Sequence, residues 1–144
     1  NAITNHGWVN GYAALPAESG GLAAIPPFLP PKIGAAPFLD WVRRHRVDCV
    51  LTLSTFRNEP NAMPEWLSAA GLRCRRDIGL VSLDVTNATA SWAGIDQNSD
   101  EIGKAAVDLV ISKIRAGERG IPRVRRSLLV HCHWREGDTV RRAR

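Results

Sequence analysis

Two carboxylates occupy positions where an α/β protein could place a ligand-binding or reacting group. Asp84 directly follows the apolar run Ile78–Leu83, and Asp96 directly follows the short apolar run Trp92–Ile95. Ligands of parallel sheets bind at the carboxyl ends of the strands, so both side chains are candidates for ligand contact. Two carboxylates without a nucleophile or a metal do not by themselves indicate catalysis. Asp84, which precedes Val-Thr-Asn, could equally bond the amides of its own turn.

The segment His131-Cys132-His133 contains side chains that bind soft metal ions. In a strand, however, His131 and His133 share one face and Cys132 points to the other. Because the three side chains cannot converge on one ion, we expect no metal site here. No other feature of the sequence indicates a cofactor.

The sequence contains no GxSxG nucleophile elbow, no GxxxxGK[ST] phosphate loop and no GxGxxG dinucleotide motif. We therefore predict a binding module and not an enzyme. Trp8 and Trp92 could stack on a sugar ring, because an indole offers a broad apolar surface. Core packing is the commoner role of tryptophan. We expect it for Trp92, and both roles stay open for Trp8.

Alternating helices and apolar strands would position these side chains. Strands are expected at Val47–Leu53, Ile78–Leu83, Trp92–Ile95 and Ser127–Trp134, and Ile25–Leu29 is an edge strand or an extended segment. Helices are expected at His6–Leu15, at Phe38–Arg46 with Pro37 in the first turn, at Pro60–Ala70 and at Ser99–Ala116. The pattern predicts an α/β fold of three layers, in which helices flank a mainly parallel sheet.

Local features refine three of these elements. Val47–Leu53 is almost continuously apolar, which is typical of a strand buried on both faces. Gly71 is suited to end the third helix in a left-handed conformation, and Gly117 is suited to end the fourth. Asn98 and Glu101 have the spacing of a capping box at the start of the fourth helix. The apolar stripe of that helix consists of Ile102, Ala105, Ala106, Leu109 and Ile114.

Length and composition favour one soluble domain. The chain has 144 residues, a formal net charge of +5 and three cysteines, Cys49, Cys74 and Cys132. The odd number and wide spacing of the cysteines argue against a disulfide framework and favour a cytoplasmic location. No apolar run reaches the roughly 20 residues of a membrane span. Asn1-Ala2 has the appearance of a remnant of an expression tag, and no secretory signal follows it.

The positive charge alone does not predict direct DNA binding. Many of the basic residues fall where helices end, a position that the helix dipole favours. We find no recognition helix and no aromatic side chains interleaved with the basic ones. The chain itself is therefore not expected to bind nucleic acid.

Five segments resemble the lactose-repressor family of transcription regulators in their order and spacing. In chain order they are HGWVNGYAAL, VDCVLTLST, GLRCRRDIGLVSLDV, AGIDQNSDEIGKAAVDLVISKI and RSLLVHCHWREGDTV. No single segment is very specific, but together they span nearly the whole chain. The resemblance implies a fold of the periplasmic-binding-protein-like type I, in which a small effector binds between two lobes.

The resemblance also implies that the chain is part of the effector-binding and dimerisation domain. Residues 3–96 and 135–144 would belong to the carboxy-terminal lobe, and residues 97–134 would pack on the amino-terminal lobe of the full protein. Half a cleft cannot enclose an effector, so we expect weak or no effector affinity. Operator DNA would be bound only through an amino-terminal headpiece that precedes Asn1, in a homodimer, with no membrane association.

The resemblance assigns ligand contacts to individual positions. Asp84 matches an aspartate that contacts the effector, and Gln97 matches a glutamine that follows the third strand. Ser54, Thr55 and Trp8 occupy binding positions but differ from the common residues there. Trp8 replaces an arginine, and an indole lacks the forked donors of a guanidinium. An aromatic ring at this place favours a carbohydrate effector.

Two alternatives remain open at the level of the sequence. The first is a periplasmic sugar-binding protein of a transporter with the same fold, which an upstream signal peptide would indicate. The second is a small flavodoxin-like or hydrolase-like enzyme. It would need a nucleophile or a phosphate loop, neither of which we find.

Overall fold

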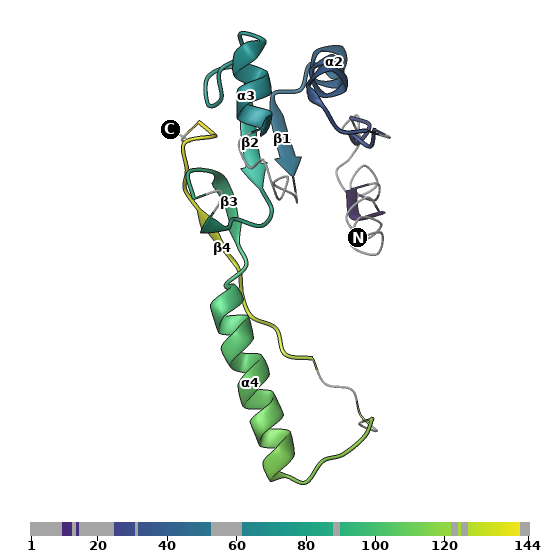
Figure 1. The fold of residues 1–144 in the computed structure, drawn as a ribbon, viewed down its shortest axis with the longest axis vertical. Coiled ribbons are helices and arrows are strands. Elements are labelled where there is room, and N and C mark those ends of the chain that lie inside the picture. The colour runs from purple at the N-terminus through teal and green to yellow at the C-terminus, as the bar shows by residue number, and fades with distance from the viewer. Residues whose placement is uncertain are drawn as a thin grey trace. The chain divides into compact units, whose positions relative to one another are not determined.

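The computed structural model describes residues 10–12, 14, 25–30, 32–52, 62–87, 90–121, 124 and 127–141. The chain forms two compact units, residues 1–47 and residues 48–144. Figure 1 shows the order of the elements, which runs α2, β1, α3, β2, β3, α4 and β4. Most of the predicted helix His6–Leu15 lies outside the described residues.

The first unit contains the helix α2, Ala35–His45, which buries Phe38 and Val42. The helix begins three residues before the predicted Phe38, and Pro37 lies in its first turn. The ring of Phe28 packs against Phe38 and Trp41, with ring centroids 5.7 Å and 5.5 Å apart. Residues 25–30 form no strand, because Pro26 and Pro27 cannot donate to a sheet. The backbone there is instead held by side chains: Trp41 Nε1 donates to Pro26 O at 2.8 Å.

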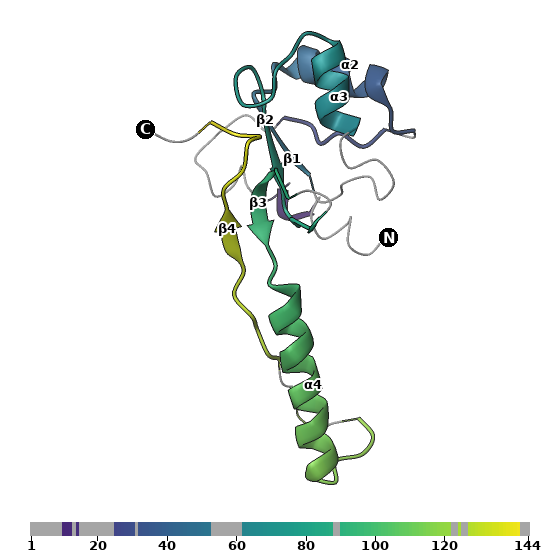
Figure 2. The ribbon, with the colours of Figure 1, turned by 60° about the vertical axis from the view of Figure 1, so that its left-hand side comes forward.

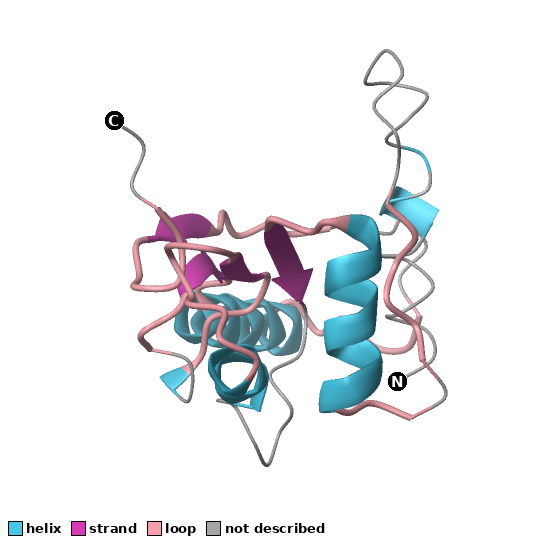
Figure 3. Ribbon diagram, turned by 90° about the horizontal axis from the view of Figure 1, so that it is seen from above, coloured by secondary structure: helices cyan, strands magenta, loops and turns pink. Residues whose placement is uncertain are grey.

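The second unit contains a four-stranded, mostly parallel sheet flanked by helices, so the predicted α/β class is confirmed at this level. The strands are β1 (Cys49–Thr52), β2 (Gly79–Ser82), β3 (Ala93–Asp96) and β4 (His133–Arg135), in the order β1-β2-β3-β4 (Figure 2). β1, β2 and β3 are parallel, and β4 is antiparallel to β3. The strands are short, with three or four residues each, and loops connect them to the helices (Figure 3).

The core of this unit is built from β2, the start of β3 and the helix α3, Ala62–Ala69. Leu80 and Leu67 are fully buried, and Trp92 is 2 % exposed, which confirms its expected core role. Gly71 ends α3 with a φ of 78°, as its position predicted. The predictions of a buried strand at Ile78–Leu83 and of a helix at Pro60–Ala70 are therefore confirmed in their main parts.

Two strand predictions were partly wrong. β1 is an edge strand of the described sheet, and its side chains alternate between buried Val50 and exposed Leu51, so it is not buried on both faces. Leu51 is 64 % exposed. β4 covers only His133–Arg135, whereas residues 127–132 have no regular structure. An apolar run cannot by itself tell an edge strand from a central one, because neighbours decide which face is covered.

The segment that contains Thr139, near the carboxyl end of the chain, packs beside the first residues of β2 and β3. Thr139 is buried, and its hydroxyl donates to Leu80 O at 2.6 Å and accepts the Ala93 N–H at 3.0 Å. The Leu80 N–H donates to Thr139 O at 3.0 Å. One threonine thus joins two neighbouring strands to a third segment.

Replacing Thr139 by valine is expected to lower the free energy of unfolding by about 2 kcal/mol, because the buried Ala93 N–H loses its acceptor and Leu80 O loses a donor. Thr139→Ser keeps the hydroxyl and should lose much less. Urea unfolding followed by circular dichroism measures both variants. A Thr139→Val variant as stable as the unsubstituted chain would show that the hydroxyl contributes nothing to stability.

The helix α4 spans Ser99–Arg115, close to its predicted bounds, and Gly117 follows it with a φ of 67°. The predicted capping box does not form. Asn98 adopts a left-handed conformation, with a φ of 54°, and its side chain makes no cap hydrogen bond. It donates instead to His131 O, and Glu101 pairs with Lys104. No residue of α4 is buried.

Candidate functional site

The carboxyl ends of the three parallel strands lie side by side. The Leu83 N–H donates to Thr52 O at 2.8 Å, which joins the end of β1 to the residue after β2. The Val85 N–H donates to Ile95 O, also at 2.8 Å, which joins the same turn to β3. Polar side chains that follow these strands are therefore presented at one edge of the sheet, where ligands of such folds bind.

Asp84 is positioned by the last residue of β2. Ser82 is fully buried, and its hydroxyl donates to Asp84 O at 2.8 Å and accepts the Asp84 N–H at 3.2 Å. The hydroxyl of Ser82 thus holds the turn through the backbone of Asp84. Among the residues that the structure describes, no group bonds the half-buried carboxylate of Asp84. That carboxylate can accept hydrogen bonds from a ligand.

Gln97 lies beside Asp84. Its Nε2 donates to Leu83 O at 3.0 Å, so the side chain reaches from the end of β3 to the residue before Asp84. The amide oxygen of Gln97 is an additional acceptor at the same edge. Of the five predicted ligand contacts, these two are described and brought together. Ser54, Thr55 and Trp8 lie outside the described residues.

Asp96 belongs to a separate set of contacts at the start of α4. Its Oδ1 accepts the Asn98 N–H at 2.9 Å, and its Oδ2 lies 4.0 Å from His133 Nε2. The Asn98 side chain donates to His131 O at 2.6 Å. The carboxylate of Asp96 is therefore engaged in local structure, unlike that of Asp84. These contacts hold the segment that follows β3 against the segment that precedes β4.

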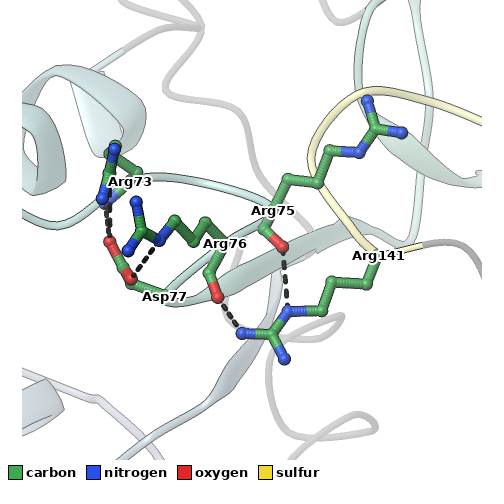
Figure 4. Close-up of polar contacts among 5 residues, drawn as sticks. All are labelled: Arg73, Arg75, Arg76, Asp77 and Arg141. Atoms are coloured by element: carbon green, nitrogen blue, oxygen red, sulfur yellow. Dashed lines mark hydrogen bonds and ion pairs between the residues drawn. The ribbon is translucent and has the colours of Figure 1, made fainter.

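A shallow pocket of about 240 Å³ lies at the opposite edge of the sheet, beside Cys49 and Gly79, the first residues of β1 and β2. Arg141 lines it and donates through Nε to Arg75 O at 3.1 Å and through Nη2 to Arg76 O (Figure 4). Asp77 also lines it and pairs with Arg73 and Arg76. Because Arg141 bonds two backbone carbonyls, it fastens the carboxy-terminal segment to the turn before β2.

Two pKa shifts occur at this opposite edge. Burial, together with the charge of Asp48, raises the pKa of the Cys49 thiol. The backbone N–H of Arg73, with help from the Arg73 and Arg76 guanidinium groups, lowers the pKa of Asp77. All three cysteines are free. Neither shift creates a nucleophile, because a raised thiol pKa reduces the reactive thiolate.

The described part of the chain contains no group of three or more His, Cys, Asp or Glu side chains arranged to hold a metal ion. In the same part, no helix has the length and apolar character needed to cross a bilayer. Comparison with models of protein families, with curated proteins and with solved structures found no match to this chain. The geometry of the site therefore has to carry any functional conclusion.

Proposed function

We propose that this chain is the effector-sensing part of a cytoplasmic, dimeric transcription regulator of the lactose-repressor family, and that its effector is a carbohydrate. The observation that carries the proposal is the meeting of Asp84 and Gln97 at the carboxyl edge of the parallel strands. A carboxylate that has no partner among the described residues, together with a side-chain amide, suits the hydroxyl groups of a sugar, which both donate and accept hydrogen bonds.

In this proposal the position of Gln97 explains how binding would be transmitted. Gln97 directly precedes Asn98, which begins α4 and bonds His131 in the returning segment. A ligand held by Gln97 therefore acts on both segments that lead to the second lobe. An effector with different affinities for the open and closed lobe arrangements shifts their populations. Operator binding through the amino-terminal headpiece changes with that shift, and the coupling is reciprocal.

The exposed apolar residues of segment 97–134 also support the proposal. Ile102 and Leu109 of α4 are exposed, and so are Leu128 and Leu129 of the returning segment. Side chains of this kind are normally covered in a folded protein, and adjacent apolar residues mark an interface. In the proposed regulator the other lobe covers them.

The site can be tested by nuclear magnetic resonance on the 144-residue chain. Titration with D-glucose, D-galactose, D-ribose and, as a purine probe, adenine should shift amide signals of residues 83–85 and 95–98 for at least one probe. With only one side of the cleft present, we expect dissociation constants of about 1 mM or weaker. Asp84→Asn should weaken binding about tenfold, because it removes charge-assisted hydrogen bonds.

Asp40→Asn is the matched control, since Asp40 lies in the first unit and pairs with Arg44. It should leave the titration unchanged. Amide-signal shifts that cluster at the pocket lined by Arg141 would contradict the proposed binding site. A dissociation constant in the micromolar range would contradict the expectation that the chain forms only one side of the cleft. The coding sequence upstream of residue 3 distinguishes the proposed regulator from the alternative, a periplasmic sugar-binding protein of a transporter. The regulator requires a helix-turn-helix domain there, and the periplasmic protein requires a signal peptide.

A further inference from the structure

The helix α4 carries two apolar faces. Ile102, Ala105, Ala106 and Leu109 have the spacing i, i+3, i+4 and i+7, which is the pattern of one buried helix face. Val107, Val110, Ile111 and Ile114 repeat the same spacing five residues later. With about 3.6 residues per turn, the two sets point in directions well over 90° apart. We call the second set the outer face. Ile114 belongs to this face and not to the stripe in which the sequence analysis placed it.

The outer face is uncovered. Its four side chains are between 40 % and 71 % exposed. A single flat partner covers one face of a helix, so a lobe that packs on Ile102 and Leu109 leaves the outer face in water. Isolated helices of this length are marginally stable in water and gain most of their stability from packing. A second partner is therefore required to bury the outer face.

The charges that border the outer face indicate which partner fits. Asp108 and Arg115 lie seven residues apart and hence on the same edge of the helix. Within the described residues neither has an ion-pair partner, whereas Lys104 and Lys113 pair with Glu101 and Glu118. An acid and a base left unpaired on one edge are complementary to the same edge of an antiparallel copy.

We propose that the outer face of α4 binds the outer face of α4 in a second copy of this chain, antiparallel and about a two-fold axis. With the axis between Val110 and Ile111, Val107 of each copy lies opposite Ile114 of the other. Asp108 then lies within about 3 Å, measured along the helix, of the position of Arg115 in the other copy. Two ion pairs flank four apolar side chains from each copy. In a parallel pair about a two-fold axis, the edge that carries Asp108 and Arg115 would face the opposite edge of the other copy, so the two charges would not meet.

The proposed function also requires a two-fold dimer, but this assignment of its surface rests on α4 alone. A contact of two 17-residue helices is small, so we expect the 144-residue chain to dimerise with a dissociation constant of about 1–100 μM. Sedimentation velocity across that concentration range measures it.

Two apolar-to-lysine variants test which face pairs. Val110→Lys places a charge at the centre of the outer face and should weaken dimerisation at least about tenfold. Leu109→Lys is its matched control on the other face and should leave the dimer unchanged. Lysine is a good helix former and α4 is exposed, so both variants keep the fold, which circular dichroism checks.

Charge reversal tests the orientation. Asp108→Arg and Arg115→Asp should each weaken the dimer several-fold, and the double variant should recover most of the loss, because it restores the pairs with exchanged signs. A chain that stays monomeric at about 100 μM, a dimer that Val110→Lys leaves intact, or a double variant weaker than both single variants would each overturn the proposal. A monomeric chain would also remove the dimer from the proposed function, but none of these results bears on ligand binding at Asp84, which the titration tests by itself.

Discussion

Gly94→Ala is expected to abolish the cooperative unfolding transition of the second unit. Gly94 is central to the sheet, because it pairs with Ser82 of β2 and with Arg135 of β4. A Cβ at this position would lie 2.0 Å from Ser82 O and 2.9 Å from Ser82 N. Both are backbone atoms of a neighbouring strand, so no side-chain rotation can relieve the overlap. The strands would have to separate, and a close-packed core does not tolerate that.

Urea unfolding followed by circular dichroism measures this effect. Gly103→Ala is the matched control, because no atom lies within 4 Å of a Cβ at that position of α4. Alanine is the better helix former, so the control is expected to keep or raise stability, by up to about 1 kcal/mol. A Gly94→Ala protein with the urea midpoint of the unsubstituted chain would show that β2 and β3 are not packed as described.

Trp92→Ala is expected to lower the free energy of unfolding by about 3–5 kcal/mol. The loss has two parts: the transfer of a large apolar side chain to water, and the cavity that the surrounding core cannot fill. Trp92 is 2 % exposed and immediately precedes β3. Small domains are stable by only about 5–15 kcal/mol, so much of the chain would be unfolded near 37 °C.

Trp134→Ala provides the comparison within the same residue type. Trp134 is in β4, is 46 % exposed, and donates through Nε1 to Glu136 Oε1 at 3.0 Å. Its replacement is expected to cost about 1 kcal/mol or less, because little apolar surface is lost. Thermal unfolding of the two variants under identical conditions measures the difference. Similar melting temperatures would contradict the placement of Trp92 in the core.

The elements that the sequence predicted correctly are those that local chemistry determines. β2 lies within the mainly apolar run Ile78–Leu83, and its burial follows from that run. α3 ends where Gly71 permits a left-handed conformation that other residues adopt with strain. Trp92 is buried as its size and apolar character favour. In each case neighbouring residues suffice, and no distant contact is needed to decide the outcome.

The elements that were predicted wrongly depend on distant contacts. Asn98 has the residue type of a helix cap, but its side chain donates to His131 O, 33 residues away. A capping box would need Asn98 in an extended conformation, and the contact with His131 accompanies a left-handed one. The exposure of Leu51 likewise depends on the position of β1 at an edge of the sheet. The spacing of residues in the sequence predicts neither the contact of Asn98 with His131 nor the edge position of β1.

In the candidate site, too, some features follow from neighbouring residues and others depend on distant contacts. The position of Asp84 at the end of β2 could be predicted, because the residue directly follows an apolar run. The role of Ser82 was missed, because a serine within an apolar strand usually indicates nothing beyond tolerance of a small side chain. The contact of Gln97 with Leu83 O depends on strand order, which the sequence does not encode locally.

The antiparallel pairing of β3 with β4 has a consequence for how the chain could have diversified. Asp96, the last residue of β3, is opposite His133, the first residue of β4. Everything from position 97 to position 132 is therefore an insert whose two ends meet at one rung of the sheet. A short hairpin turn would bridge that rung. Lengthening or exchanging the insert beyond Gln97 would leave in place the turn that holds Asp84 and the contact of Gln97 with Leu83 O, so ligand recognition and partner choice can evolve independently of each other.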